Sequence, residues 1–296
     1  MPLLKRVRVL AAKVEATPGV AESLVTGDAA HNVYDIDIQS STTVTERPQQ
    51  GGFNYMLSTV EGHAGTVSFK LNPYGNGLGG EGAWVNTFLP ACGLVGGQPT
   101  AEAPGSNVKT LTIGVYENGV YKQLRGCAGD FTMTCATGKL IELEFTFTGI
   151  WDTPTDVAIL APTYPDVIPF RATGGLTLGS WTPCVESLTF AMGNTVVGRE
   201  CQADDSGLDY SVVTDRKSTC TLNPEATLVA TNDAYTDWYS SVNKALNYSI
   251  AQGSDNMALA INDCQITNIQ EGDRNGIQVD DIELMVINDD FTLDFQ

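Results

Sequence analysis

Residues 33–41 read VYDIDIQSS, a stretch in which apolar and polar residues alternate. This period of two predicts a half-buried strand, with Ile36 and Ile38 on its buried face. A similar alternation returns 152 residues later, where Leu188 stands in the place of Ile36. The repeated alternation therefore indicates that the chain contains one fold twice.

Two further landmarks recur in the same order and at nearly the same distance. The tripeptide Leu71-Asn72-Pro73 returns as Leu222-Asn223-Pro224, a shift of 151 residues. The third landmark is an apolar set spaced for one face of a helix, which returns after 154 residues. Its members are Trp84, Phe88, Ala91 and Cys92, and then Trp238, Val242, Ala245 and Leu246. Two copies in one chain are typical of a protein that builds a ring or tube rather than of an enzyme.

The length of 296 residues agrees with two domains, each large enough for its own core. The first is expected over residues 1–155, a proline-rich linker over 156–169, and the second over 170–296. Hairpins are predicted with an Asn-Gly turn at 118–119 and around residues 273–276, and one helix per copy over 81–93 and 233–247. The predicted fold class is mainly β, with antiparallel sheets and one flanking helix in each copy.

The net charge of −19 is unevenly distributed. Residues 1–155 carry 10 basic and 14 acidic residues, a net of −4, whereas residues 156–296 carry 6 and 21, a net of −15. Phosphate binding needs a basic surface, so this composition argues against a protein that grips nucleic acid. It permits DNA to pass an acidic wall without adhering, although simple solubility is the alternative explanation.

The segment 75–80, Gly-Asn-Gly-Leu-Gly-Gly, fits the G-x-G-x-x-G pattern. In nucleotide-binding proteins such glycines let the backbone approach a pyrophosphate at a helix N-terminus. However, Pro73 precedes the segment, and the surroundings lack alternating strands and helices. The segment is therefore interpreted as a turn before the helix, with a nucleotide site as the alternative.

Other chemistry has weak support. Neither His31 nor His63, the two histidines, lies in a nucleophile motif. The seven cysteines form no C-x-x-C pair and are interpreted as reduced thiols, with a Cys127–Cys135 disulfide across a hairpin as the alternative. Acidic clusters such as residues 280–281 are interpreted as solvated, with calcium binding as the alternative. The first residues lack the apolar core of a signal peptide, so we expect the protein to stay in the cell that makes it.

Three segments resemble the tail tube (major tail) proteins of long-tailed bacteriophages. Residues 12–20, AKVEATPGV, are similar to the opening of that family. The strand over 33–41 and the long segment after it are similar to its loop-bearing strand pair. Residues 126–149, from GCAGDF to FTFTG, resemble its C-terminal hairpin with a glycine at the turn. The resemblance covers the first copy well and the second only by pattern.

The resemblance implies two tandem β-sandwich tube domains, each with one flanking helix. Six such domains form a ring with a continuous inner β-barrel, and rings stack into a conduit for DNA. Two domains per chain then imply a homotrimeric, pseudo-hexameric ring of the siphophage type. The implied partners are further copies of the chain, the tape-measure protein, the tail terminator and the distal tail or baseplate proteins. The implied location is the virion tail, assembled in the cytoplasm of the bacterial host, and no cofactor is implied.

Other classes of protein remain possible. The nearest is the inner tube of a contractile tail or of a type VI secretion system, which a neighbouring sheath gene would indicate. A phage head or collar subunit is another, and an enzyme of unknown chemistry is the last. A filament seen by electron microscopy would separate a tube builder from an enzyme.

Two sets of residues are the candidate functional residues. The segment 42–60 is long for a connection and carries apolar residues in a polar stretch, so it is expected to pack on the adjacent ring or a neighbouring subunit. Its candidate contact residues are Arg47, Phe53, Tyr55, Met56 and Leu57. The second set comprises acidic residues that alternate with apolar ones and are expected to line the lumen. They are Glu142, Glu144, Asp281 and Glu283.

Overall fold

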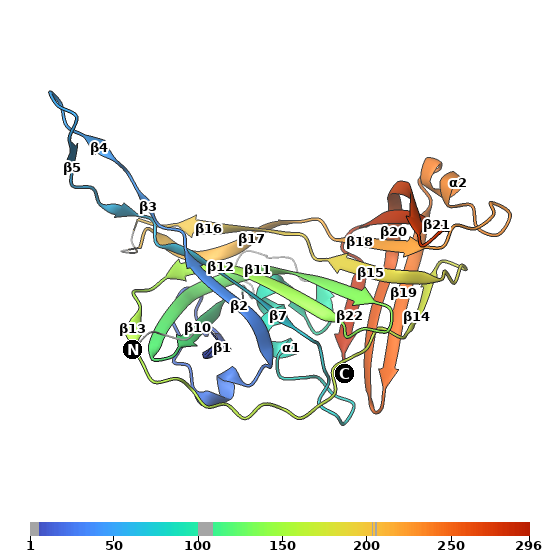
Figure 1. Ribbon diagram of the computed structural model, residues 1–296, viewed down its shortest axis with the longest axis horizontal. Coiled ribbons are helices and arrows are strands. Elements are labelled where there is room, and N and C mark those ends of the chain that lie inside the picture. The colour runs from blue at the N-terminus through green and yellow to red at the C-terminus, as the bar shows by residue number, and fades with distance from the viewer. Residues whose placement is uncertain (1–5, 100–108, 203, 205) are drawn as a thin grey trace.

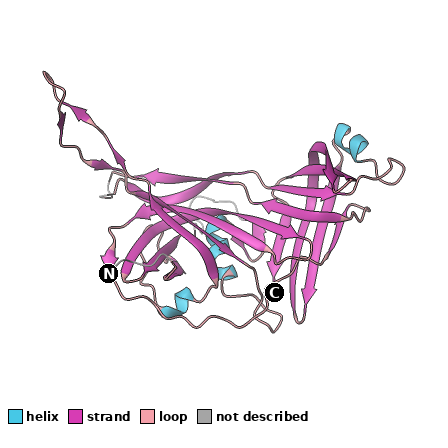
Figure 2. Cartoon of the chain, in the orientation of Figure 1, coloured by secondary structure: helices cyan, strands magenta, loops and turns pink. Residues whose placement is uncertain are grey.

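The computed structural model describes residues 6–99, 109–202, 204 and 206–296. Strands dominate it, and the described helical segments are short (Figure 2). The α-helices are α1 (Val85–Phe88) and α2 (Ala234–Tyr239), and the 3-10 turns are η1 (Thr26–Ala29) and η2 (Leu89–Cys92). The predicted mainly antiparallel β fold is confirmed.

The strands are divided here between a first half, β1 to β13, and a second half, β14 to β22. The main strands of the first half are β1 (Arg8–Val14), β2 (Val33–Ser40), β7 (Ala64–Leu71), β10 (Leu111–Glu117), β11 (Val120–Ala136) and β12 (Glu142–Trp151). Those of the second half are β14 (Gly175–Leu178), β15 (Val185–Ala191), β18 (Thr219–Pro224), β19 (Asn243–Gln252), β20 (Asp255–Arg274) and β21 (Ile277–Val286).

Each half also carries a hairpin and short accessory strands. Hairpin one contains β3 (Thr43–Val44), β4 (Arg47–Pro48), β5 (Tyr55–Met56) and β6 (Val60–Glu61), and hairpin two contains β16 (Asn194–Glu200) and β17 (Leu208–Arg216). The accessory strands are β8 (Leu94–Val95), β9 (Gln98–Pro99), β13 (Thr155–Asp156) and β22 (Phe291–Phe295). Residues 157–170, between the halves, form neither helix nor strand.

The two halves have the same strand order. The first half pairs as β1-β10-β11-β12-β7-β2, and the second as β14-β19-β20-β21-β18-β15. In each half a hairpin connects the second and third main strands, and a short helix lies between the third and fourth. This correspondence of elements is what an internal duplication produces.

The halves join into one continuous sheet because β11 pairs with β15, from Thr132 opposite Ala191 to Ala136 opposite Ser187 (Figure 1). Their hydrophobic cores also merge. The ring of Phe295, from the last strand, lies 4.8 Å from that of Trp84 in the first half. One buried cluster therefore spans both halves, whereas the sequence suggested a separate core for each.

The predicted helix over 233–247 is wrong beyond residue 239. Ser241 has a φ of 52°, a left-handed conformation that stops the helix, and residues 243–252 then form β19. Val242 and Leu246 are therefore not equivalent to Phe88 and Cys92. In the first half, all four residues of the apolar set are buried, and Gly93 ends the turn with a φ of 76°.

The predicted shift between the two copies of the strand also needs correction. Val33 lies opposite Leu71, and Leu188 lies opposite Leu222. Leu188 is therefore equivalent to Val33 rather than to Ile36. In addition, an irregularity in β2 at Asp35, which has a φ of 51°, shifts the register between Tyr34 and Asp37, so that no single offset relates the two strands.

The alternative of a Cys127–Cys135 disulfide is wrong. Both residues lie on the single strand β11, so their backbones are roughly 26 Å apart at about 3.3 Å per residue. All seven cysteines are free, and burial raises the pKa of the Cys135 thiol to about 12.

Candidate functional site

One face of the continuous sheet is polar, and the other packs on the core. Along β12 the side chains of Leu143, Phe145 and Phe147 are buried, while those between them face away from the core. The same alternation places Ile282 and Leu284 of β21 in the core, with Glu283 between them on the polar face.

Strand register carries the polar face from one half into the other. Residues that lie directly opposite each other share a face of the sheet. One such row contains Glu142, Thr134, Thr189, Thr221, Glu283 and Asn268. Glu142 and Glu283 are therefore on the same face, about 19 Å apart for four strand spacings of ~4.8 Å.

Three of the four candidate acidic residues in this face make no ion pair at hydrogen-bonding distance among the described residues. The exception is Glu142, whose carboxylate accepts a 2.8 Å hydrogen bond from Lys70 Nζ and a 2.9 Å bond from the Tyr34 hydroxyl. Lys70 lies 4.0 Å from Glu144. The hydrogen bond from Lys70 lowers the pKa of Glu142. The pKa of Tyr34 is raised to about 12, mainly by burial and also by its hydrogen bond to Glu142.

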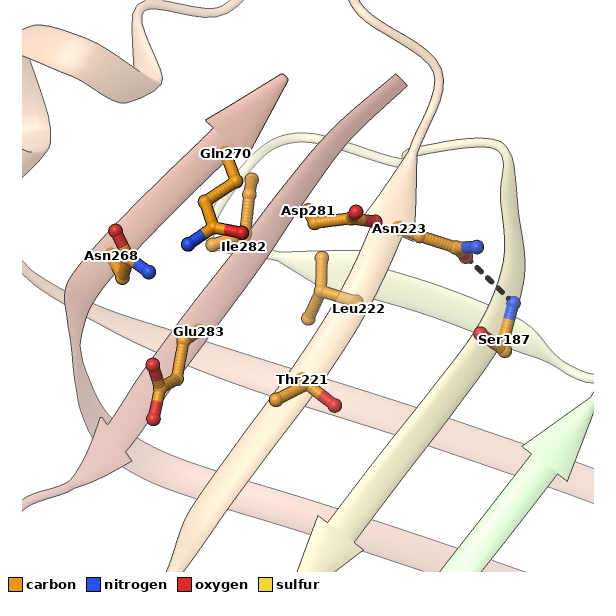
Figure 3. Close-up of a pocket in the computed structure, with 9 residues that line it drawn as sticks. All are labelled: Ser187, Thr221, Leu222, Asn223, Asn268, Gln270, Asp281, Ile282 and Glu283. Carbon is orange, nitrogen blue, oxygen red and sulfur yellow. Dashed lines mark hydrogen bonds between the residues drawn. The ribbon is translucent and has the colours of Figure 1, made fainter. Parts of the chain in front are cut away.

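The polar face is shallowly hollowed in the second half, between β15 and β20 (Figure 3). Its lining is mostly neutral amides and hydroxyls, with Asp281 and Glu283 as the charged residues. The Asn223 side chain accepts 3.1 and 2.8 Å bonds from the backbone N–H groups of Glu186 and Ser187. The residues that line the hollow thus provide neutral hydrogen-bonding groups and two carboxylates, and none of these lining residues is a cation that would retain a phosphate.

Hairpin one projects away from the body of the protein (Figure 1). Phe53 is fully exposed at its tip, Leu57 is 94% exposed, and Tyr55 and Met56 are also exposed. The Arg47 guanidinium donates to the Leu57 carbonyl at 3.3 Å, which links the two strands. The five candidate residues are thus brought together on one exposed hairpin, and the predicted loop is in fact a strand pair.

Hairpin two lies against the first half instead of projecting. The Asn194 side chain donates to the carbonyls of Cys92 and Gly129, at 2.7 and 2.9 Å. Arg125 of β11 forms an ion pair with Asp204, near the hairpin tip, at 3.3 Å. Ser211 is 2% exposed. The sequence signals for these contacts are weak, because each partner lies more than 60 residues away.

The glycine segment 75–80 holds a carboxylate of the protein itself. The backbone N–H groups of Gly77 and Gly79 each donate to Asp255, at 2.9 Å. A Cβ on Gly75 would lie 2.6 Å from the Asp255 carboxylate, so only glycine fits there. The anion-binding geometry that the pattern suggested thus binds the first half to the first residue of β20.

The histidines and acidic residues form no reactive cluster in the described part of the chain. No group of three or more His, Cys, Asp or Glu side chains is placed there to hold a metal ion. None of the helices described is both long and apolar enough to span a membrane. His31 is a core residue, 3% exposed, with its ring 4.9 Å from that of Phe88.

The burial of His31 predicts a pH dependence of stability. Burial lowers its pKa from 6.5 to about 4, against a smaller opposing contribution from Asp28. Below pH 6.5 the unfolded chain binds a proton that the folded chain does not, so stability falls by up to about 3 kcal/mol by pH 4. The free energy of unfolding should be measured as a function of pH for the wild type and for His31→Leu. The difference between the two free energies should be constant above pH 7 and should shift in favour of the variant below pH 7. A pH-independent difference would contradict this assignment.

Comparison with known proteins gives one family. A family model described as phage tail tube protein matches residues 6–295. No curated protein matches the chain.

Proposed function

This chain belongs to the phage tail tube protein family, whose members are structural proteins of the virion, and we propose that three copies close into each ring of the tube. The rings stack into the conduit through which DNA leaves a siphophage particle. The tape-measure protein, the tail terminator and the distal tail or baseplate proteins are its partners there, as the family resemblance implies.

The observation that carries this proposal is the junction between β11 and β15. It joins two equivalent six-strand units edge to edge within one chain. The same two edges recur elsewhere in the sheet, at β2 and along residues 266–274 of β20, which pair only with β21 among the described strands. The counterpart of β15 is β2, which pairs only with β7 among the described strands, and the counterpart of β11 is β20. Repeating the junction between chains joins β20 of one copy to β2 of the next.

The backbone directions of these two edges are complementary. Arg274 and Ile277 close a two-residue turn and are a hydrogen-bonded pair. Hydrogen-bonded and non-hydrogen-bonded pairs alternate along an antiparallel ladder, so Glu271 directs its backbone N–H and C=O groups away from β21. Next to β2, the backbone N–H of Ser41 donates to the carbonyl of Ala64. The backbone N–H and C=O groups of Ile38 and Ser40 therefore point away from β7, toward the free edge of the sheet. Unpaired edges of this kind promote association, and a head-to-tail ring removes them.

We propose that the polar sheet face lines the channel. When units join edge to edge, their sheets give the ring one continuous inner surface. The polar face already continues from the first half into the second through the pairing of β11 with β15. Glu142, Glu144, Asp281 and Glu283 with Lys70 leave a net of about −3 on it per chain. Such a wall repels phosphate, which suits DNA that must pass without adhering.

A charge-reversed lumen should slow DNA release. The variant replaces Glu144, Asp281 and Glu283 with lysine and keeps the Lys70–Glu142 ion pair. Assembly should be retained, because exposed charges contribute about 0–1 kcal/mol each. Phosphates would release counterions on binding the lysines, so DNA release should slow at low salt and recover as salt rises. Release can be measured by fluorescence of a dye that binds the ejected DNA.

The matched control replaces three exposed carboxylates outside the polar face with lysine. They are Glu81, Asp156 and Asp166. The control has the same total charge, so it should release DNA at the wild-type rate. If the lumen variant assembles and also releases DNA at the wild-type rate at low salt, the polar face does not line the channel.

A further inference from the structure

The junction inside the chain is apolar on the core side of the sheet. Cys135 of β11 lies opposite Leu188 of β15. The backbone N–H of Ile141, just before β12, donates to the carbonyl of Phe170 at 3.0 Å, and Phe170 belongs to the segment that leads into β14. All four side chains are buried, so the two halves meet at these positions without a charge.

Strand register identifies the residues that hold the same positions at the edges of β2 and β20. Leu71 and Leu222 are equivalent in the two halves, and the paired strands can be counted outward from them. Counted in this way, Cys135 matches Glu271, Ile141 matches Asp280, and Leu188 matches Val33. In the order of elements, the segment that leads into β14, with Phe170, matches the start of β1, with Arg6 and Arg8.

The edge at β20 therefore carries two carboxylates where the junction inside the chain carries apolar side chains. Glu271 of β20 and Asp280 of β21 lie directly opposite each other. They share a face of the sheet with Ile269 and Ile282, which are core residues. The pKa of Asp280 is raised by burial first and then by the charges of Glu271 and Asp281. The two opposed carboxylates thus repel each other in the free chain.

The edge at β2 carries cations beside a cavity of about 430 Å³. The Arg8 guanidinium donates to the Ile36 carbonyl at 2.7 Å and lies 2.6 Å from the Glu117 carboxylate. The Nε atom of Arg8 is buried and has no hydrogen-bond partner in the described chain. Arg6 is exposed. The residues that line the cavity are Arg6, Arg8, Val33, Tyr34, Asp35 and Ile36.

The two edges have opposite net charges. At the β2 edge three cations exceed two carboxylates, and these groups are Arg6, Arg8, Lys122, Glu117 and Asp35. At the β20 edge Arg274 is paired with Glu225 at 2.8 Å, so it does not compensate Glu271 and Asp280. Val33, which the register places opposite Glu271, is itself part of the cavity wall. Edge pairing therefore brings the two carboxylates of one copy to the cations of the next.

We propose that Arg6 and Arg8 of one copy bind Glu271 and Asp280 of the preceding copy when β20 joins β2. This inference rests on the ring described under the proposed function, and it names the side chains that select the partner edges. Like charges disfavour the pairing of two β20 edges or of two β2 edges, so head-to-tail joining is the favoured arrangement. Before assembly, both edges carry charges that water solvates.

The test reverses the charges separately and together. Arg6→Glu and Asp280→Lys should each weaken association roughly tenfold at every junction, because each brings like charges together. The double variant Arg6→Glu/Asp280→Lys restores opposite charges, so its assembly should return toward the wild-type level. Light scattering after size-exclusion chromatography measures the concentration at which rings form, and negative-stain microscopy shows the tubes.

The matched control reverses one charge of each sign away from these edges. It is Lys109→Glu/Glu81→Lys, at two exposed positions, and it should assemble as the wild type does. Loss of Glu271 alone should be tolerated, because it leaves Asp280 and removes the repulsion within the pair. Circular dichroism establishes that each variant is folded. If Asp280→Lys is not, Glu271→Lys takes its place, since Glu271 is exposed.

The outcomes separate this contact from the ring. Reversal variants that assemble as the wild type does, in tubes whose β2 and β20 edges are paired, would overturn the contact and leave the ring standing. A double variant that assembles no better than the single variants would also overturn it. Wild-type tubes in which β2 and β20 do not meet would contradict the proposed ring and this contact with it.

Discussion

Glu271→Pro is expected to give a folded chain that does not form rings. Glu271 is exposed, and its N–H points away from β21, so proline removes no hydrogen bond within the chain. In the proposed ring that N–H donates to β2 of the next copy. Its loss costs about 2 kcal/mol at each junction, or roughly 30-fold in each association constant, and the ring repeats the junction three times. Light scattering after size-exclusion chromatography measures the outcome.

The matched control is Glu271→Ala, which removes the same side chain but keeps the N–H group. It should form rings and tubes as the wild type does. Circular dichroism and thermal unfolding establish that both variants are folded. Wild-type tubes from the proline variant would show that this edge of β20 is not a subunit junction.

Deletion of residues 46–56 is expected to abolish tube formation while leaving the fold intact. The deletion removes β4, β5 and the tip of hairpin one, and it joins Thr45 to Leu57. Val44 pairs with Val60, so a loop of four residues remains between them, a length that hairpins accommodate. The deleted segment contains Phe53, Tyr55 and Met56, which contact no core cluster of the described chain. Negative-stain microscopy of the purified variant gives the result.

A control variant replaces Gln49 and Gln50, polar residues near the hairpin tip, with alanine. It keeps the length and apolar residues of the hairpin and should form normal tubes. Normal tubes from the deletion variant would mean that hairpin one has no part in assembly.

The sequence could predict features that local patterns determine. Alternation along Val33–Ser40 and Glu142–Trp151 predicts half-buried strands, and Asn275-Gly276 predicts the turn between β20 and β21. The sequence also predicted that Leu71 and Leu222 are equivalent, and both occupy the same position relative to their partner strands. The prediction of a helix over 233–247 was wrong beyond residue 239, because strand pairing outweighed the weak helical spacing of the apolar residues. Residues 243–252 instead form a strand between β14 and β20.

The relation between the halves could not be predicted, because it depends on contacts between distant residues. Asp255 is bound by Gly77 and Gly79, about 180 residues away, and nothing local marks it as their anion. Likewise, the alternation in β12 and β21 identifies a polar face for each strand separately. Only the register from Glu142 through Thr189 to Glu283 shows that these faces are one surface.

The number of chains in a ring tests the central claim most directly. A cryo-electron microscopy reconstruction of the assembled tube, calculated without imposed symmetry, measures it. We expect three chains per ring, with six equivalent sheet units around the channel and β20 of each copy paired to β2 of the next. Six chains per ring, or a ring in which β2 and β20 remain unpaired, would contradict the account.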